Sequence, residues 1–117
     1  MRNIRQLGEV PPMLAELRTR ATWLPGYARR VTSKCGEDGI TEKALDLLPT
    51  RNRWCVELGA HDGVSNSNTC NMIYNHEYSA VLIECDERKF CRLSSNYQGC
   101  GRVIPLNHLV QVRGQTL

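Results

Sequence analysis

Three signatures are missing from the sequence: a Cys-x-x-Cys pair, a Gly-x-Gly-x-x-Gly fingerprint and a long apolar run. Without a Cys-x-x-Cys pair, a zinc ribbon or a redox-active cysteine pair has no support. Without the glycine fingerprint, a nucleotide-dependent oxidoreductase becomes a minor alternative. A membrane span needs about 18 apolar residues in succession, and a secretory signal needs an apolar segment near the N-terminus. The sequence therefore predicts neither a membrane span nor a signal peptide.

The excess of positive charge is small, at +3 from 15 basic and 12 acidic residues, and it gives no support for nucleic-acid binding. Residues 1–30 hold six arginines and only two acids, Glu9 and Glu16. We therefore predict a basic helical extension over residues 1–32 and a neutral domain over residues 33–117. An arginine-rich leader that targets an organelle is a minor alternative, because the acids and the paired prolines 11 and 12 are untypical of such leaders.

The sequence contains six cysteines, and an even number leaves disulfides open as an alternative. Cys55 and Cys85 fall in apolar, strand-like runs, where a free cysteine behaves as a small hydrophobic side chain. We therefore predict reduced, mostly buried thiols and a cytoplasmic location. His76 and His108 show no spacing typical of metal ligands, so the sequence predicts no metal site.

Strand and helix patterns alternate along the chain. Strands are predicted over residues 54–58, 80–84 and 102–107, and helices over residues 13–24, 40–48, 68–76 and 87–97. This alternation indicates βαβ units, so we predict an α/β fold whose partial parallel sheet has its strands side by side in sequence order. The first strand would then be an unpaired sheet edge, through which the chain could self-associate.

The first predicted helix follows Pro11 and Pro12 and is expected to end at Pro25 and Gly26. We expect it to pack on the domain or on a neighbour. A basic helix lying on a membrane surface is the alternative.

The segment that most strongly indicates a functional site runs from Trp54 to Gly63, with sequence WCVELGAHDG. It predicts a buried strand that runs into a glycine turn, which is how a nucleotide-type cofactor site begins in an open α/β sheet. Gly59 permits the sharp turn, and Gly63 is expected to let a ligand approach the backbone. Glu57 lies inside the apolar strand, where an acid needs a partner or a ligand.

A second acid, Glu84, ends the next predicted strand, 21 residues after Gly63. An acid at this position can accept hydrogen bonds from the ribose hydroxyls of an adenosine. A pyrophosphate at the glycine turn would lie beside Asp62, and the like charges disfavour it. S-adenosylmethionine has no phosphate and carries positive charges that suit nearby carboxylates, so it is the cofactor that we predict.

Four segments in this order resemble the N-terminal half of FkbM-like methyltransferases. They are residues 36–39 (GEDG), 55–63 (CVELGAHDG), 67–69 (SNT) and 81–86 (VLIECD), with Phe90 and Tyr97 following. The resemblance spans roughly residues 33–112 and implies a class I, Rossmann-like, three-layer fold that uses S-adenosylmethionine. Two positions depart from the family pattern: Lys34 stands where glutamine is common, and His61 stands where an aromatic residue is common.

The resemblance also implies a set of cofactor-binding residues. Glu57, Gly59, Ala60 and Gly63 would surround the methionine part of the cofactor, Glu84 would bind the ribose, and Asn107 with its neighbours would lie near the adenine. The implied reaction is methylation of a hydroxyl group of a small molecule or sugar. His61 is a candidate general base for that hydroxyl, and a histidine that merely lies beside the cofactor is the alternative.

Such methyltransferases continue through further strands that help to form the acceptor site. We therefore expect the 117-residue chain to be a truncated, cofactor-binding half that is poorly active by itself. The alternative from another class is a binding module that keeps this fold without catalysis.

Overall fold

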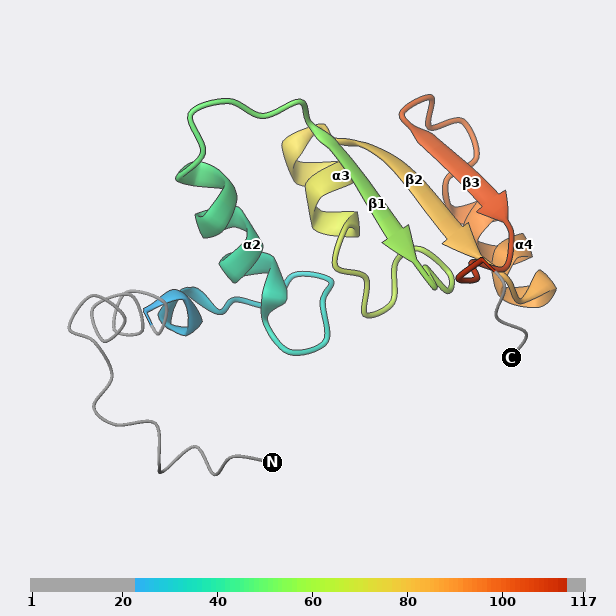
Figure 1. The fold of residues 1–117 in the computed structure, drawn as a ribbon, viewed down its shortest axis with the longest axis horizontal. Helices are drawn as coiled ribbons and strands as arrows, with labels where there is room; N and C mark the ends of the chain where they lie inside the picture. The colour runs from blue at the N-terminus through green and yellow to red at the C-terminus, as the bar shows by residue number, and fades with distance from the viewer. Residues whose placement is uncertain (1–22, 114–117) are drawn as a thin grey trace.

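The computed structural model describes residues 23–113 and shows an α/β fold (Figure 1). Its elements in chain order are η2 (Leu24–Tyr27), α2 (Glu37–Asp46), β1 (Trp54–Leu58), α3 (Cys70–His76), β2 (Ser79–Glu84), α4 (Glu87–Asn96) and β3 (Val103–Asn107).

The three strands form one parallel sheet in the order β1-β2-β3, as the sequence predicts. Val56 lies opposite Val81, and Ile83 lies opposite both Leu58 and Leu106. Each strand is joined to the next by a helix, α3 or α4, so the chain consists of two consecutive βαβ units. The carboxyl ends of all three strands therefore meet at one end of the sheet (Figure 1).

The predicted element bounds differ from the observed ones by up to three residues. The strand over residues 54–58 is confirmed, whereas α2 begins at Glu37 instead of residue 40. The earlier start has a local cause: Gly36 adopts a left-handed conformation at φ 92°, and the helix begins directly after it.

The predicted helix over residues 13–24 lies almost wholly outside the described residues. At its predicted end the structure shows a turn at Trp23 and then the short 3-10 helix η2, which contains Pro25 and Gly26. Proline is tolerated there because the first turn of a helix does not use its backbone N–H group.

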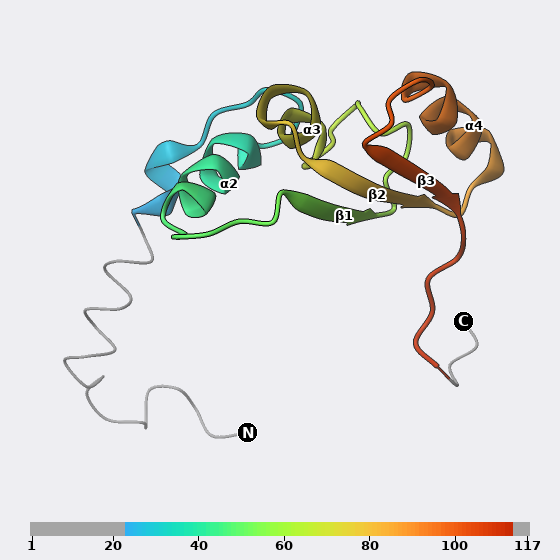
Figure 2. The same ribbon diagram turned by 90° about the horizontal axis from the view of Figure 1, so that it is seen from above.

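The core lies between the sheet and the two crossover helices. Ala80 and Leu82 of β2 are fully buried and pack against Ile73 of α3 and Leu93 of α4. Figure 2 shows α3 and α4 on the same side of the sheet, with no described element on the other side. The described residues thus form two layers, and the third layer implied by the resemblance is not among them.

Two acidic side chains attach α2 to the rest of the fold. Asp38 is buried and accepts hydrogen bonds from the backbone N–H groups of residues 31, 32 and 33 and from the Ser33 hydroxyl. Glu42 contacts Arg29 on one side and both Asn71 and His76 of α3 on the other. Burial opposes the charge on Glu42, but these donors outweigh it and lower its pKa from 4.5 to about 2.

All six cysteines are free, and only Cys70 is fully buried. The prediction of mostly buried thiols is wrong, because Cys35, Cys85 and Cys91 are exposed. Cys85 follows the last residue of β2 and is not inside the strand. Burial and the nearby Glu57 raise the pKa of Cys55 to about 11, so this thiol stays protonated at neutral pH.

Candidate functional site

Two neighbouring cavities lie at the carboxyl ends of the strands. The polar cavity has a volume of about 220 Å³ and is lined by Glu57, Gly59, Ala60, His61, Ser65, Asn66 and Ser67. The apolar cavity has a volume of about 330 Å³ and is lined by Leu58, Gly59, Ile83, Cys85, His108, Leu109 and Val110. Gly59 lines both, so the cavities meet at the turn that follows β1. Ligands of open α/β sheets bind at this end of the strands.

Glu57 is held in place by the loop that precedes α3. Its carboxylate accepts hydrogen bonds from the hydroxyls of Ser67 and Thr69 at 2.8 and 2.5 Å, and from the Asn68 backbone N–H at 3.1 Å. These donors account for an acid inside an apolar strand, because they compensate for the water it loses. A carboxylate has about four acceptor positions, so Glu57 retains the capacity to bind a donor in the polar cavity.

The two glycines of the turn have different roles. Gly59 has a φ of +67°, and a Cβ atom there would meet nothing within 4 Å, so its surface opens onto the cavities. Gly63 lines neither cavity, and a Cβ atom there would lie 2.5 Å from both Leu93 Cδ1 and Tyr97 Cε2. Gly63 therefore serves the packing of Leu93 and Tyr97, because both fill the space where its side chain would be. The approach of a ligand to its backbone stays a prediction.

The Glu84 carboxylate is also hydrogen-bonded within the chain. Its Oε1 accepts a hydrogen bond from the Asp86 backbone N–H at 2.9 Å, and its Oε2 accepts one from the His61 backbone N–H at 2.7 Å. The bond from Asp86 is the largest cause of a lowered Glu84 pKa, and burial opposes it. Glu84 is buried and lines neither cavity. In this structure it fixes the turn between β1 and α3.

Asn107 joins the ends of β2 and β3. Its side-chain amide donates hydrogen bonds to the backbone carbonyls of Glu84 and Cys85 at 2.9 and 3.3 Å. Asn107 does not line the apolar cavity, but the next three residues, His108, Leu109 and Val110, do. Sequence reasoning named the neighbourhood of Asn107 without naming these residues.

The polar cavity is lined by one acid, Glu57, and a second acid is bonded to one of its lining residues. Asp62 accepts hydrogen bonds from the backbone N–H groups of Val64 and of Ser65, which lines the cavity. Burial opposes the charge on Asp62, but these bonds and the Ser65 hydroxyl lower its pKa. The exposed His61 ring lies with Nδ1 3.9 Å from Asp62 Oδ1. A cationic or neutral ligand therefore fits this cavity better than a phosphate does.

The loop that lines the polar cavity is connected to α2. Thr32 donates its hydroxyl to the Ser67 backbone carbonyl at 3.0 Å, and Ser33 pairs with Asn66 in an isolated parallel bridge. Thr32 and Ser33 are themselves held by Asp38. Asp38 therefore acts through this loop on the residues that hold Glu57. The contacts of Thr32 and Ser33 with Ser67 and Asn66 join segments far apart in the sequence, so no local pattern reports them.

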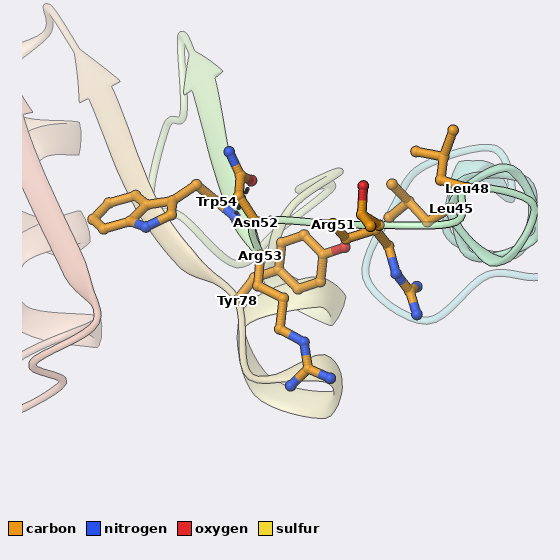
Figure 3. Close-up of a pocket in the computed structure, with 8 residues that line it drawn as sticks. Leu45, Leu48, Arg51, Asn52, Arg53, Trp54 and Tyr78 are labelled. Carbon is orange, nitrogen blue, oxygen red and sulfur yellow. Dashed lines mark hydrogen bonds between the residues drawn. The ribbon is translucent and has the colours of Figure 1, made fainter.

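A larger cavity, of about 570 Å³, lies at the opposite end of the sheet (Figure 3). It is lined by Leu45, Leu48, Thr50, Arg51, Asn52, Arg53, Trp54 and Tyr78. It adjoins the amino ends of β1 and β2, away from the glycine turn and from both acids. We do not take this cavity as the candidate site, although it is larger. Glu57 and the glycine turn, which the sequence indicates as functional, lie at the carboxyl ends of the strands.

Comparisons of the chain with protein-family models, curated proteins and solved structures find no match. Among residues 23–113, no group of three or more His, Cys, Asp or Glu side chains is placed to hold a metal ion. No helix in the same part of the chain is long and apolar enough to cross a bilayer.

Proposed function

We propose that this chain binds S-adenosylmethionine at the two joined cavities, as the cofactor-binding part of a Rossmann-like methyltransferase similar to the FkbM-like family. The observation that carries the proposal is the meeting of a polar, acidic cavity and an apolar cavity at Gly59. Together they have the size of a small-molecule site. Their chemistry matches a cofactor with a charged amino-acid end and a flat apolar base.

The polar cavity would hold the methionine end of the cofactor. Glu57, fixed by Ser67, Asn68 and Thr69, would accept a hydrogen bond from the cofactor's ammonium group. Gly59 and Ala60 would approach the cofactor through their backbone, since neither presents a bulky side chain. When bound, the cofactor supplies an electrophilic methyl group that is attacked in line by an acceptor.

The apolar cavity would hold the adenine. Four aliphatic side chains line it, so a flat ring would be buried among Leu58, Ile83, Leu109 and Val110. Glu84 would hold the backbone of His61 beside the cavity. Two of its acceptor positions remain, which is compatible with a ribose contact.

Methyl transfer to a hydroxyl group of a small molecule or sugar is the reaction that we propose. The chain's part in an in-line transfer is to align the two reactants and to remove the hydroxyl proton. His61 lines the polar cavity and is the candidate base for that proton. A cytoplasmic location belongs to the same proposal, because free thiols are typical of a reducing compartment.

The second candidate function is cofactor binding without catalysis. It is favoured by the fact that the described chain itself occupies both carboxylates, Glu57 and Glu84. The two candidates predict the same ligand and differ only in turnover.

Calorimetric titration with S-adenosylhomocysteine, NAD and ATP tests the ligand. We expect S-adenosylhomocysteine to bind and the two phosphate-containing ligands to bind at least tenfold more weakly. The Gly59→Ala variant places a methyl group where the cavities meet and should weaken binding by about tenfold or more. Gly99→Ala is the matched control, because Gly99 also has a positive φ, of +81°, with nothing within 4 Å of its Cβ position.

Two outcomes would overturn the assignment. One is binding of NAD without S-adenosylhomocysteine, and the other is equal affinity in the Gly59→Ala and Gly99→Ala variants. Incubation with methyl-labelled S-adenosylmethionine and a panel of sugars then separates the two candidates. Tight binding with no labelled product from any acceptor would favour the module without catalysis.

A further inference from the structure

The larger cavity, at the amino ends of β1 and β2, has a buried polar group in its wall that no described residue satisfies. Tyr78 is only 4% exposed, and it lines this cavity of about 570 Å³ (Figure 3). Among residues 23–113, the Tyr78 hydroxyl is the one buried polar side-chain atom without a hydrogen-bond partner. Buried polar groups are almost always paired, and an exception needs an explanation. The Tyr78 hydroxyl therefore lacks a partner that a ligand of this cavity can supply.

The start of the sheet brings Arg53 to the same cavity as Tyr78. Trp54 and Ser79 form the first pair of the register between β1 and β2. Arg53 and Tyr78 are the residues directly before this pair, and both line the cavity. The Ser79 backbone N–H donates a 2.8 Å hydrogen bond to the Arg53 carbonyl, which joins the two segments. Arg53 has a φ of 56°, a conformation that is uncommon for residues other than glycine. A cation and an unpaired hydroxyl thus share one cavity.

Two cations line this cavity, and no acidic side chain of the described residues does. Arg51 and Arg53 each have an exposed acid nearby, outside the cavity. The nitrogen–oxygen distances, 3.7 Å from Arg51 to Asp46 and 3.8 Å from Arg53 to Glu77, exceed the length of a hydrogen bond. Exposed pairs of this kind contribute little to stability, so both guanidinium groups are able to bind another anion.

One further donor and two apolar side chains contribute to the lining. The Asn52 side-chain oxygen accepts a 3.0 Å hydrogen bond from the Trp54 backbone N–H, so its NH₂ group is left as a donor. Leu45 lies in the last turn of α2, and Leu48 follows the helix. Together with the Tyr78 ring they give the cavity an apolar part. Its volume of about 570 Å³ is that of a small-molecule site.

We propose that this cavity binds a small organic carboxylate with an apolar ring body. The carboxylate would accept hydrogen bonds from the arginines and from the Tyr78 hydroxyl, and the body would pack against Leu45 and Leu48. A planar carboxylate matches the fork of a guanidinium group. Its single charge suits two arginines whose positive charge is partly offset by the acids outside the cavity. The cavity shares no lining residue with the two cavities at the carboxyl ends, so this site is independent of the proposed function.

Calorimetric titration of the full chain with 1-naphthoate tests the proposal. The probe 1-naphthamide has the same shape without the charge, and acetate has the charge without the apolar body. We expect 1-naphthoate to bind at least about tenfold more tightly than either. Tyr78→Phe and Arg53→Gln should each weaken its binding about tenfold or more, because each removes a hydrogen bond to a charged group. Tyr74→Phe and Arg88→Gln are the matched controls, because both residues are exposed and lie outside the cavity. They should bind like the wild type.

The Tyr78→Phe variant keeps the test decisive. Its loss of an unpaired hydroxyl should not lower stability, which urea denaturation checks, so weaker binding would report a lost contact with the ligand. Unchanged affinity in this variant would mean that the hydroxyl bonds a trapped water molecule at most, and the proposal would be overturned. The same holds if 1-naphthoate does not bind up to millimolar concentrations, or binds no better than 1-naphthamide. Weaker binding in Gly59→Ala but not in Tyr78→Phe would place the carboxylate in the two joined cavities instead.

Discussion

Replacement of Gly63 by alanine should strongly destabilise the fold. Gly63 has a φ of +78°, and its missing side chain leaves room for α4. An alanine Cβ would lie 2.5 Å from Leu93 Cδ1 and from Tyr97 Cε2, far inside van der Waals contact. Both neighbours are buried core residues, and close packing of a core resists their displacement.

Three effects add up to the expected loss of stability. A non-glycine residue in the left-handed region costs about 1–2 kcal/mol. Forcing a methyl group into a packed core costs about 1–3 kcal/mol. The Tyr97 hydroxyl donates a 2.7 Å hydrogen bond to the Gly63 carbonyl, and displacement of the ring would weaken it by about 1 kcal/mol. Gly63→Ala should therefore destabilise the fold by about 3–6 kcal/mol, against a typical total of about 5–15 kcal/mol.

Gly59→Ala separates the strain from the clash. Gly59 has a similar φ, of +67°, but a Cβ atom there meets nothing within 4 Å. The Gly59→Ala variant should therefore be destabilised only by the left-handed backbone strain, about 1–2 kcal/mol. Urea denaturation followed by far-ultraviolet circular dichroism measures both variants at one protein concentration. If Gly63→Ala proved no less stable than Gly59→Ala, Gly63 would not serve the packing of α4, and the distinction between the two glycines would be refuted.

Two further predictions concern stability alone. Glu42 has its folded-state pKa lowered to about 2, so its contribution is present above about pH 4.5 and is lost as the pH falls toward 2. Solvent screens the exposed Arg29, so Glu42→Gln should lower the free energy of unfolding at pH 7 by only about 1–2 kcal/mol. The variant should also lose less stability than the wild type as the pH falls below about 4.5. Urea denaturation at a series of pH values measures both effects. Asp46→Asn is its control and should change little, because Asp46 is exposed and lies 3.7 Å from Arg51. Tyr78→Phe should leave stability unchanged or raise it by up to about 1 kcal/mol, because no described residue bonds the buried Tyr78 hydroxyl. Tyr97→Phe should lower stability by about 1–3 kcal/mol in the same urea denaturation, since its hydroxyl is bonded to Gly63. Equal shifts for the two tyrosine variants would contradict this difference.

Much of the fold was predictable from the sequence because its signals are local. The apolar runs of β1 and β2, the Asp86 side chain that caps α4 and the alternation of strands and helices all depend on neighbouring residues. The parallel order of the strands then follows from the length of the crossover connections. The helix bounds were less predictable, because they depend on the conformations of single residues such as Gly36.

The candidate site was predictable only in part. Glu57, Gly59 and Ala60 do line one cavity, since they belong to a single turn that the sequence displays as a unit. The roles of Gly63 and Glu84 depend on contacts with α4 and with the turn at His61, which are distant in sequence. The same holds for Ser67 and for His108 to Val110, which the fold brings to the cavities from separate loops.

The sequence by itself determined the α/β class, the order of the strands and the acidic glycine turn at the carboxyl end of β1. Those features arise from periodicity and from glycine stereochemistry, which act over a few residues. Only the tertiary structure decided that Gly63 serves packing, that Glu84 is bonded to the backbone and that two cavities meet at Gly59. It also decided that one apolar face of the sheet has no cover among the described residues. Packing and burial are properties of segments far apart in the chain, and no local pattern reports them.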